Sequence, residues 1–126
     1  MQLKVDDALQ KLAASDGALF VKLMEQGSMS VEIYRPIDAD RQIPHLQDEL
    51  YVIISGNGDF LNNGERNTFG PGDVLFVPAG IEHRFENFST DFATWVIFYG
   101  PVGGESPKWL VLNLYHSNIY QLTTLR

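Results

Sequence analysis

The chain of 126 residues has the length of one domain, since domains commonly hold about 100–200 residues. Hydrophobic residues make up 44% and charged residues 20%, a composition that excludes a disordered chain. The 16 acidic and 9 basic side chains give a net charge of −7, which disfavours nucleic acid and anionic membranes as partners. Because no cysteine is present, disulfides and thiolate metal sites are excluded.

The N-terminal residues show no targeting signal. Asp6 and Asp7 stand where a signal peptide would begin its apolar stretch. No apolar run reaches the ~18–20 residues that a membrane-spanning helix needs. We therefore expect a single domain over residues 1–126, located in the cytoplasm, with no membrane partner.

One helix and a series of short strands are predicted in chain order. The helix is capped by Asp6 or Asp7 and ends at Gly17. From residue 18 onward, apolar and β-branched runs separated by turn residues predict strands. The Asn63-Gly64 pair between two of these runs is typical of a type I′ hairpin. The expected strands cover residues 18–25, 29–35, 49–55, 59–62, 66–69, 74–77, 83–87 and 92–99.

The C-terminal residues 101–126 form a tail outside a barrel core of about residues 18–100. Residues 100–104 are predicted to be a loop with little preference for order, because three of the five are glycine. Trp109–Tyr115 is apolar and favours an edge strand or an arm packed on a partner subunit, although Ser106-Pro107 is equally a helix start. We interpret His116 as a surface or interface residue.

The short strands and regularly spaced turns predict an all-β domain with one short N-terminal helix. Periodicity alone leaves a β-sandwich and a β-barrel open. A sheet of this kind has edges that need protection, and the apolar tail needs a surface to cover it, so we expect a homodimer.

Two histidines and a glutamate are the candidates for chemistry. In an extended strand, residues 43, 45, 47 and 49 would share a face, which brings His45 and Glu49 together with Gln47. An imidazole and a carboxylate inside an apolar barrel are costly unless they are paired or bind a cation. Divalent metals accept both groups as ligands, whereas a solvent-facing polar loop is the alternative reading. Asp48 has the opposite parity and is expected to be a solvated charge.

Two spaced motifs follow each other along the chain. His45, Glu49 and Gly56 fit H-x3-E-x6-G. The second motif, G-x5-P-x-G-x2-H-x3-N, is matched without exception by Gly72, Pro78, Gly80, His83 and Asn87. Together they resemble the cupin superfamily, in the manner of a small single-domain protein of the cupin-2 type. The resemblance spans about residues 29–99.

The resemblance implies a double-stranded β-helix, or jelly-roll barrel, with a divalent metal in its mouth. Carried over by position, His45, Glu49 and His83 are implied metal ligands. The family's first histidine falls at Ile43, so one protein ligand is lost. Three ligands leave coordination positions open, as in non-haem iron oxygenases and open zinc sites, and Gln47 is a candidate for a fourth, weaker ligand.

The family includes oxygenases and isomerases, so we expect a metal-dependent enzyme acting on a small organic molecule. Iron, manganese, zinc and nickel are all compatible with the donor set. No further acid or base is evident, because Arg84 and Glu86 should point outward from the second motif. The alternative is a module that binds or senses a small ligand without turnover.

Overall fold

The computed structural model describes residues 1–106 and contains one helix and eight strands over that range. Every strand expected up to residue 99 is present, with its ends shifted by no more than two residues. The Asn63-Gly64 turn is also confirmed, since both residues have a positive φ, 53° and 85°. The elements are α1 (Val5–Ala13), β1 (Phe20–Gln26), β2 (Met29–Tyr34), β3 (Asp48–Ser55), β4 (Gly58–Asn62), β5 (Glu65–Phe69), β6 (Val74–Val77), β7 (His83–Glu86) and β8 (Ala93–Tyr99).

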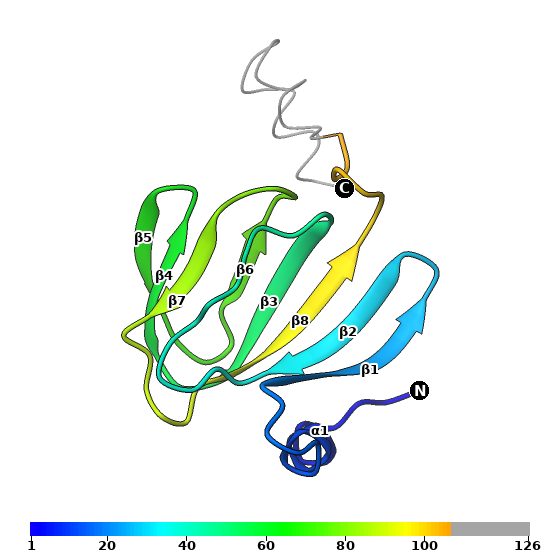
Figure 1. The fold of residues 1–126 in the computed structure, drawn as a ribbon, viewed down its shortest axis with the longest axis vertical. Helices are drawn as coiled ribbons and strands as arrows, with labels where there is room; N and C mark the ends of the chain where they lie inside the picture. The colour runs from blue at the N-terminus through cyan, green and yellow to red at the C-terminus, as the bar shows by residue number, and fades with distance from the viewer. Residues whose placement is uncertain (107–126) are drawn as a thin grey trace.

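The strands form two antiparallel sheets that face each other (Figure 1). The larger sheet has the order β1-β2-β8-β3-β6, and the smaller has the order β5-β4-β7. Strands far apart in the sequence are therefore neighbours, as β2 and β3 both pair with β8. The all-β jelly-roll architecture is confirmed, and it places β3 and β7, which carry Glu49 and His83, on opposite sheets.

Aromatic side chains fill the space between the sheets. Phe85 lies at the centre, with its ring centroid 4.6 Å from those of both Phe60 and Phe92. Tyr51 from the larger sheet meets Phe85 edge to face at 4.8 Å. These side chains are at most 4% exposed, so they form a buried aromatic core at this end of the domain.

The helix α1 packs on the outer face of the larger sheet. Ala8 and Leu12 on its buried side contact Ile33 of β2, which is completely buried. The N-cap residue is Lys4, two residues before Asp6, the earlier of the two expected aspartate caps, and no side chain caps the helix. Within residues 1–106, no helix combines the length and the apolar character needed to cross a bilayer.

Two expectations for the first motif do not hold. Residues 43, 45 and 47 do not share a strand face with Glu49, because β3 begins only at Asp48. The Asp48 carboxylate is not solvated either: it is buried and accepts hydrogen bonds from the backbone N–H groups of Ala79 and Glu105, each at 2.9 Å. The loop of residues 100–104, which was predicted to have little preference for order, is held by backbone hydrogen bonds of Gly103 and Gly104. The segment Trp109–Tyr115 and His116 lie outside the described residues.

Candidate metal centre

Three side chains from separate elements converge at one end of the core. His45 comes from the loop before β3, Glu49 from β3 and His83 from the start of β7. One nitrogen or oxygen atom of each lies within 4.8 Å of the others. Glu49 and His83 are buried, while His45 is partly exposed. The cluster is therefore enclosed by the core around Glu49 and His83 and is accessible to solvent beside His45.

The hydrogen-bond pattern leaves two of these buried groups without a partner. His45 Nδ1 lies 3.1 Å from Glu49 Oε1. His83 Nδ1 donates to the Ile81 carbonyl at 2.9 Å, so Nε2 is the nitrogen that offers a lone pair whenever the ring is neutral. Nε2 lies 3.2 Å from Glu49 Oε1 without the alignment of a hydrogen bond. Among the described residues, Glu49 Oε2 and His83 Nε2 have no hydrogen-bond partner.

The electrostatics of the cluster favour an ionised glutamate. Burial alone would raise the pKa of Glu49, but the close approach of His45 and His83 and the charges of these imidazoles outweigh it and lower the pKa. Burial lowers the pKa of His83, but the nearby Glu49 carboxylate and the hydrogen bond to the Ile81 carbonyl raise it overall. A buried carboxylate facing an imidazole lone pair needs a shared cation, either a proton or a metal ion. The donor set therefore fits a divalent metal.

Ile43 and Gln47, which were expected on the same strand face as His45 and Glu49, do not join the cluster. Ile43 is 74% exposed and supplies no ligand atom. The Gln47 amide nitrogen donates to the carbonyls of Ser28 and Gly100, both at 2.9 Å. Because the segment before Asp48 is a loop, alternation does not hold there, and Gln47 turns to the β1–β2 turn and the end of β8. We therefore leave Gln47 out of the candidate ligand set.

Backbone and ring contacts hold the loop histidine in place. The Gly80 N–H donates to the His45 carbonyl at 2.8 Å, so a glycine of the second motif fixes a residue of the first. The His45 ring rests edge-on against Phe98 of β8, with centroids 4.9 Å apart. Gly56 of the first motif is needed for packing, since a Cβ there would lie 2.6 Å from the Phe92 Cα. The two motifs thus act together on one site.

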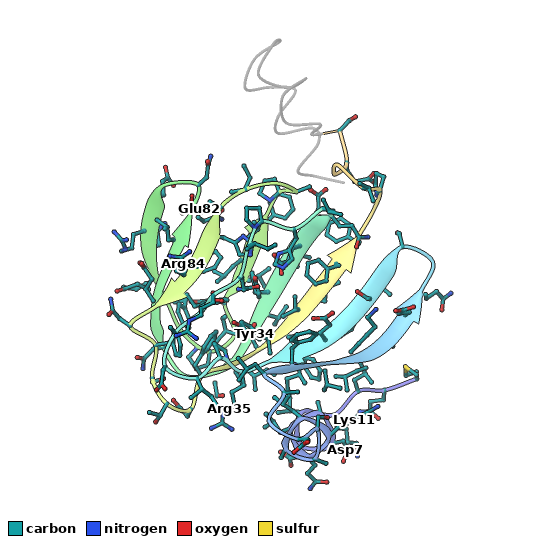
Figure 2. The ribbon with its side chains drawn as sticks, in the orientation of Figure 1. Asp7, Lys11, Tyr34, Arg35, Glu82 and Arg84 are labelled. Carbon is teal, nitrogen blue, oxygen red and sulfur yellow. The ribbon has the colours of Figure 1, made fainter. Side chains whose placement is uncertain are left out.

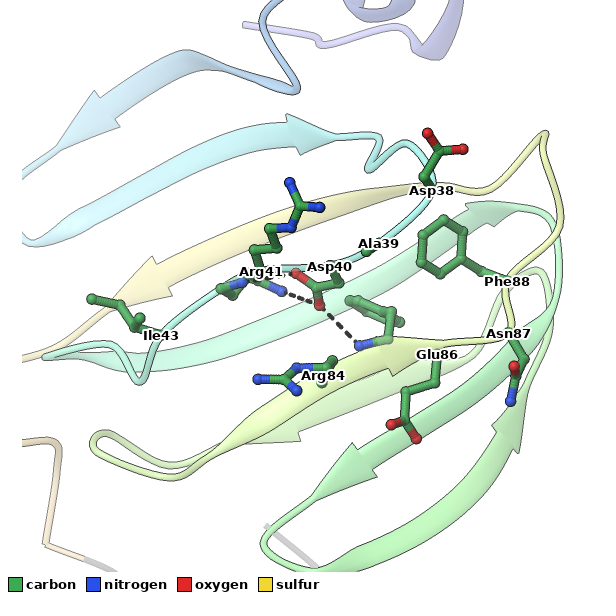
Figure 3. Close-up of a pocket in the computed structure, with 11 residues that line it drawn as sticks. Asp38, Ala39, Asp40, Arg41, Ile43, Arg84, Glu86, Asn87 and Phe88 are labelled. Atoms are coloured by element: carbon green, nitrogen blue, oxygen red, sulfur yellow. Dashed lines mark hydrogen bonds between the residues drawn. The ribbon is translucent and has the colours of Figure 1, made fainter.

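Asp40 anchors the loop that carries His45, and sequence reasoning missed it. Its carboxylate accepts hydrogen bonds from the Tyr34 hydroxyl (2.7 Å), from the backbone and side chain of Gln42 (3.1 and 2.8 Å), and from the Phe85 N–H (2.9 Å). Figure 3 shows the contacts of Asp40 with Gln42 and Phe85 at a hollow of about 440 Å³, which Arg84 borders. Asp40 is 4% exposed. Nothing in the sequence around a loop aspartate marks it as buried.

Arg84 and Glu86 were predicted to point outward from the second motif. Figure 2 shows Arg84 on β7 of the smaller sheet, with Glu82 just before that strand, and both are exposed. Glu86 is half-buried and pairs with Arg66 at 2.7 Å across the sheet. Asn87 bonds the Asp59 carboxylate at 3.1 Å. None of these groups reaches the cluster of His45, Glu49 and His83.

A cavity of about 770 Å³ opens beside His45. One wall is the inner face of β1, β2 and β8, and the other is the loop of residues 37–43. Glu32 of β2 lies in this wall, and its pKa is raised mainly by burial. Sequence reasoning missed Glu32, because its alternation with apolar Val31 and Ile33 indicates a solvent-facing carboxylate, whereas Glu32 lines the inner cavity with Tyr34. The lining residues are Ala18, Leu19, Phe20, Glu32, Tyr34, Ile37, Ala39, Arg41, Gln42, Ile43, His45, Val96 and Phe98.

Comparison with known proteins adds distant relatives of known activity. An acireductone dioxygenase of Leishmania infantum is 37% identical to this chain over 75 residues. That match covers 55% of this chain but only 20% of the relative, so the chain spans about a fifth of that enzyme's length. A cupin-2 domain protein of Shewanella frigidimarina has a similar structure, with a TM-score of 0.60 over 78% of this chain and 94% of that one. At 14% identity, this likeness concerns the fold alone.

A more complete match comes from an uncharacterised protein of Streptomyces coelicolor. It is 36% identical over 101 residues, which cover 78% of this chain and 94% of the relative. The family model of the cupin domain matches residues 31–99, which is more than half of the chain and includes both motifs. The chain therefore belongs to the cupin family.

Proposed function

We propose that this protein binds a divalent metal ion through His45, Glu49 and His83 and uses it as an oxygenase-type enzyme on a small organic molecule. The observation that carries the proposal is the pair of buried, unpartnered atoms, Glu49 Oε2 and His83 Nε2. Leaving both unpaired in a low-dielectric site costs several kcal/mol, at about 1–3 kcal/mol for each polar group and more for a charged one. A metal ion relieves that cost.

Each ligand has a distinct structural role. Glu49 is fixed on β3 between β8 and β6, where it pairs with Phe98 and Val77 in the register. His83 is oriented by the hydrogen bond from its Nδ1 to the Ile81 carbonyl, the arrangement that fixes the tautomer of metal-binding histidines. A divalent metal with open coordination positions supplies Lewis-acid or redox chemistry when bound.

The adjoining cavity sets the kind of substrate. Its volume of about 770 Å³ lies in the range of small-molecule sites, and its wall is largely apolar. Glu32 faces this space and, with its raised pKa, is suited to accept or return a substrate proton. Arg41 lines the same cavity and offers a positive charge to an anionic substrate group. The likeness to acireductone dioxygenases makes an acireductone the first substrate to test.

Metal binding is tested on stripped protein by equilibrium dialysis against Fe(II), Mn(II), Ni(II) and Zn(II), followed by elemental analysis. We expect about one metal ion per chain and a rise in melting temperature. His83→Ala and Glu49→Gln should lose uptake while keeping the fold. Glu82→Gln, next to His83 but exposed, is the matched control and should bind as the native chain does. Uptake that survives His83→Ala would contradict the ligand assignment.

Turnover is measured separately, as oxygen consumption by the metal-loaded protein in the presence of an acireductone. The second candidate function is a non-catalytic ligand-binding module. Ile43 favours it, because this side chain leaves the set one ligand short of the family's full complement. Stoichiometric metal without any oxygen consumption would support the module, whereas turnover that Glu32→Gln abolishes would support the enzyme.

A further inference from the structure

Six apolar side chains form a continuous patch on the outer face of the larger sheet. Alternation along the strands places them opposite Tyr51, Val77 and Val96, which point into the core. Val74 is 61% exposed and Phe76 is 44% exposed. The outer patch consists of Val31, Leu50, Val52, Val74, Phe76 and Ile97.

The register makes these side chains direct neighbours. Leu50 pairs with Ile97 on one side and with Phe76 on the other, while Val52 pairs with Val74. The helix α1 covers only the end of the face over β1 and β2, where it contacts Ile33. In Figure 1, β3 and β6 lie away from α1. Contiguous apolar surface of this kind is rarely left exposed on a soluble chain, so it marks a place that something covers.

The described chain ends at this face, at a point that is held firmly. The buried Asp48 carboxylate accepts the N–H groups of Ala79 and Glu105, and Asp48 has the same parity on β3 as Leu50. Gly104 adopts φ +88°, and a Cβ there would lie 2.7 Å from Asp48 Oδ1. Residue 105 is therefore fixed at the ends of β3 and β6, immediately beside the outer patch.

We propose that the segment Trp109–Tyr115 of this chain docks on the outer patch of the same molecule. Its sequence, Trp-Leu-Val-Leu-Asn-Leu-Tyr, is apolar at six of seven positions. The four residues from Glu105 to Trp109 reach up to about 14 Å, whereas Leu50 lies only two residues, about 7 Å, along β3 from Asp48. Seven residues span between about 10 Å and 23 Å, which is enough to cross β6, β3 and β8 at ~4.8 Å per strand.

The same-chain segment is favoured over a second copy for two reasons. Tethering through a short linker gives the segment an effective concentration of about millimolar, which no separate molecule reaches in dilute solution. The net charge of −7 also opposes association of two copies through this face, so the proposal covers the apolar tail without the homodimer expected from the sequence. The inference rests on the outer face and stands independently of metal binding at the opposite face of the sheet.

Tryptophan fluorescence of the full-length chain tests the proposal. The chain has two tryptophans, so Trp95→Phe leaves Trp109 as the only one. We expect its emission to lie at short wavelength in the native state, compared with the same chain in denaturant. Adding Phe76→Ser, or Val74→Ser if the first variant does not fold, should move the emission to longer wavelength. Phe20→Ser is the matched control, because Phe20 is a similarly exposed aromatic on the opposite, inner face.

The remaining outcomes overturn the proposal. Emission at the wavelength of the denatured chain would show that Trp109 is in water. Emission that Phe76→Ser and Phe20→Ser shift equally would show that the outer patch is not the docking surface. Short-wavelength emission that is lost on dilution, together with a light-scattering mass that falls to the 14.2 kDa monomer, would assign the patch to a second copy.

Discussion

Replacing Asp40 by asparagine tests whether one buried carboxylate holds the loop that carries His45. The two oxygens of Asp40 accept four hydrogen bonds, two each. In the asparagine variant one oxygen becomes an NH2 group, which cannot accept and which faces two donors. Either the Tyr34 hydroxyl with the Gln42 N–H, or the Phe85 N–H with the Gln42 amide, is then left without its acceptor.

The size of the effect follows from that count. A hydrogen bond to a charged group contributes about 1.5–3 kcal/mol, so the loss of two lowers the free energy of unfolding by about 3–6 kcal/mol. This is a large part of the ~5–15 kcal/mol that stabilises a typical domain. Because Asp40 joins the loop to Tyr34 of one sheet and Phe85 of the other, the change should also loosen His45 and weaken metal binding about tenfold.

Urea denaturation of the chelated protein measures the first effect, and metal titration measures the second. Asp38→Asn is the matched control: Asp38 lies in the same loop, is exposed and has a φ of 65° that asparagine accepts readily. We expect it to stay within about 0.5 kcal/mol of the native chain. An Asp40→Asn variant as stable as this control would refute the anchoring role.

Three further predictions follow from single features. In chelated protein, stability should be greatest between about pH 4.5 and 6.5. Because folding raises the pKa of His83, this residue contributes stability in full below its ordinary pKa of 6.5, and the contribution is lost as pH rises through the folded pKa. Because folding lowers the pKa of Glu49, this residue contributes stability above its ordinary pKa of 4.5, and that contribution is lost as pH falls through the folded pKa. Thermal melts of the native chain and His83→Ala check this, since the variant should lose the decline on the alkaline side. Glu32→Gln should retain metal uptake but lose turnover, and equal loss of both would contradict a role in proton transfer. Gly104→Ala should destabilise the fold by about 1–3 kcal/mol more than Gly103→Ala does. Both glycines have a positive φ, but only a Cβ at residue 104 would clash with Asp48. Equal melting temperatures of the two variants would refute this.

Local signals account for the success of strand and turn prediction. Asn63-Gly64 formed the expected hairpin because both residues tolerate a positive φ, a property of the residues themselves. The strand boundaries were likewise recoverable, because Gly and Pro interrupt apolar runs wherever the chain must turn. Periodicity did not distinguish a sandwich from a barrel, because that choice depends on which strands pair, and β2 and β8 are about 60 residues apart.

Alternation failed where the chain left the strand. His45 was expected to share a strand face with Gln47, but residues 43–47 form a loop, and the Gln47 amide bonds carbonyls at residues 28 and 100 instead. The spacing of His45 and Glu49 nevertheless brought the two together, since both belong to one short segment. The motif therefore correctly indicated that His45 and Glu49 lie together, although the strand geometry assumed for residues 43–47 was wrong.

The sequence by itself determined the length of the strands, the tight turns, the acidic charge and the pair of motifs that supplies the three candidate metal ligands. Only the tertiary structure decided which polar groups are buried: Asp40 and Asp48 each collect backbone N–H groups from distant segments, and Glu32 faces a cavity beside His45. The reason is physical. A residue's φ preference and its neighbours in the chain act locally, whereas the cost of burying a charge depends on donors that folding brings from elsewhere.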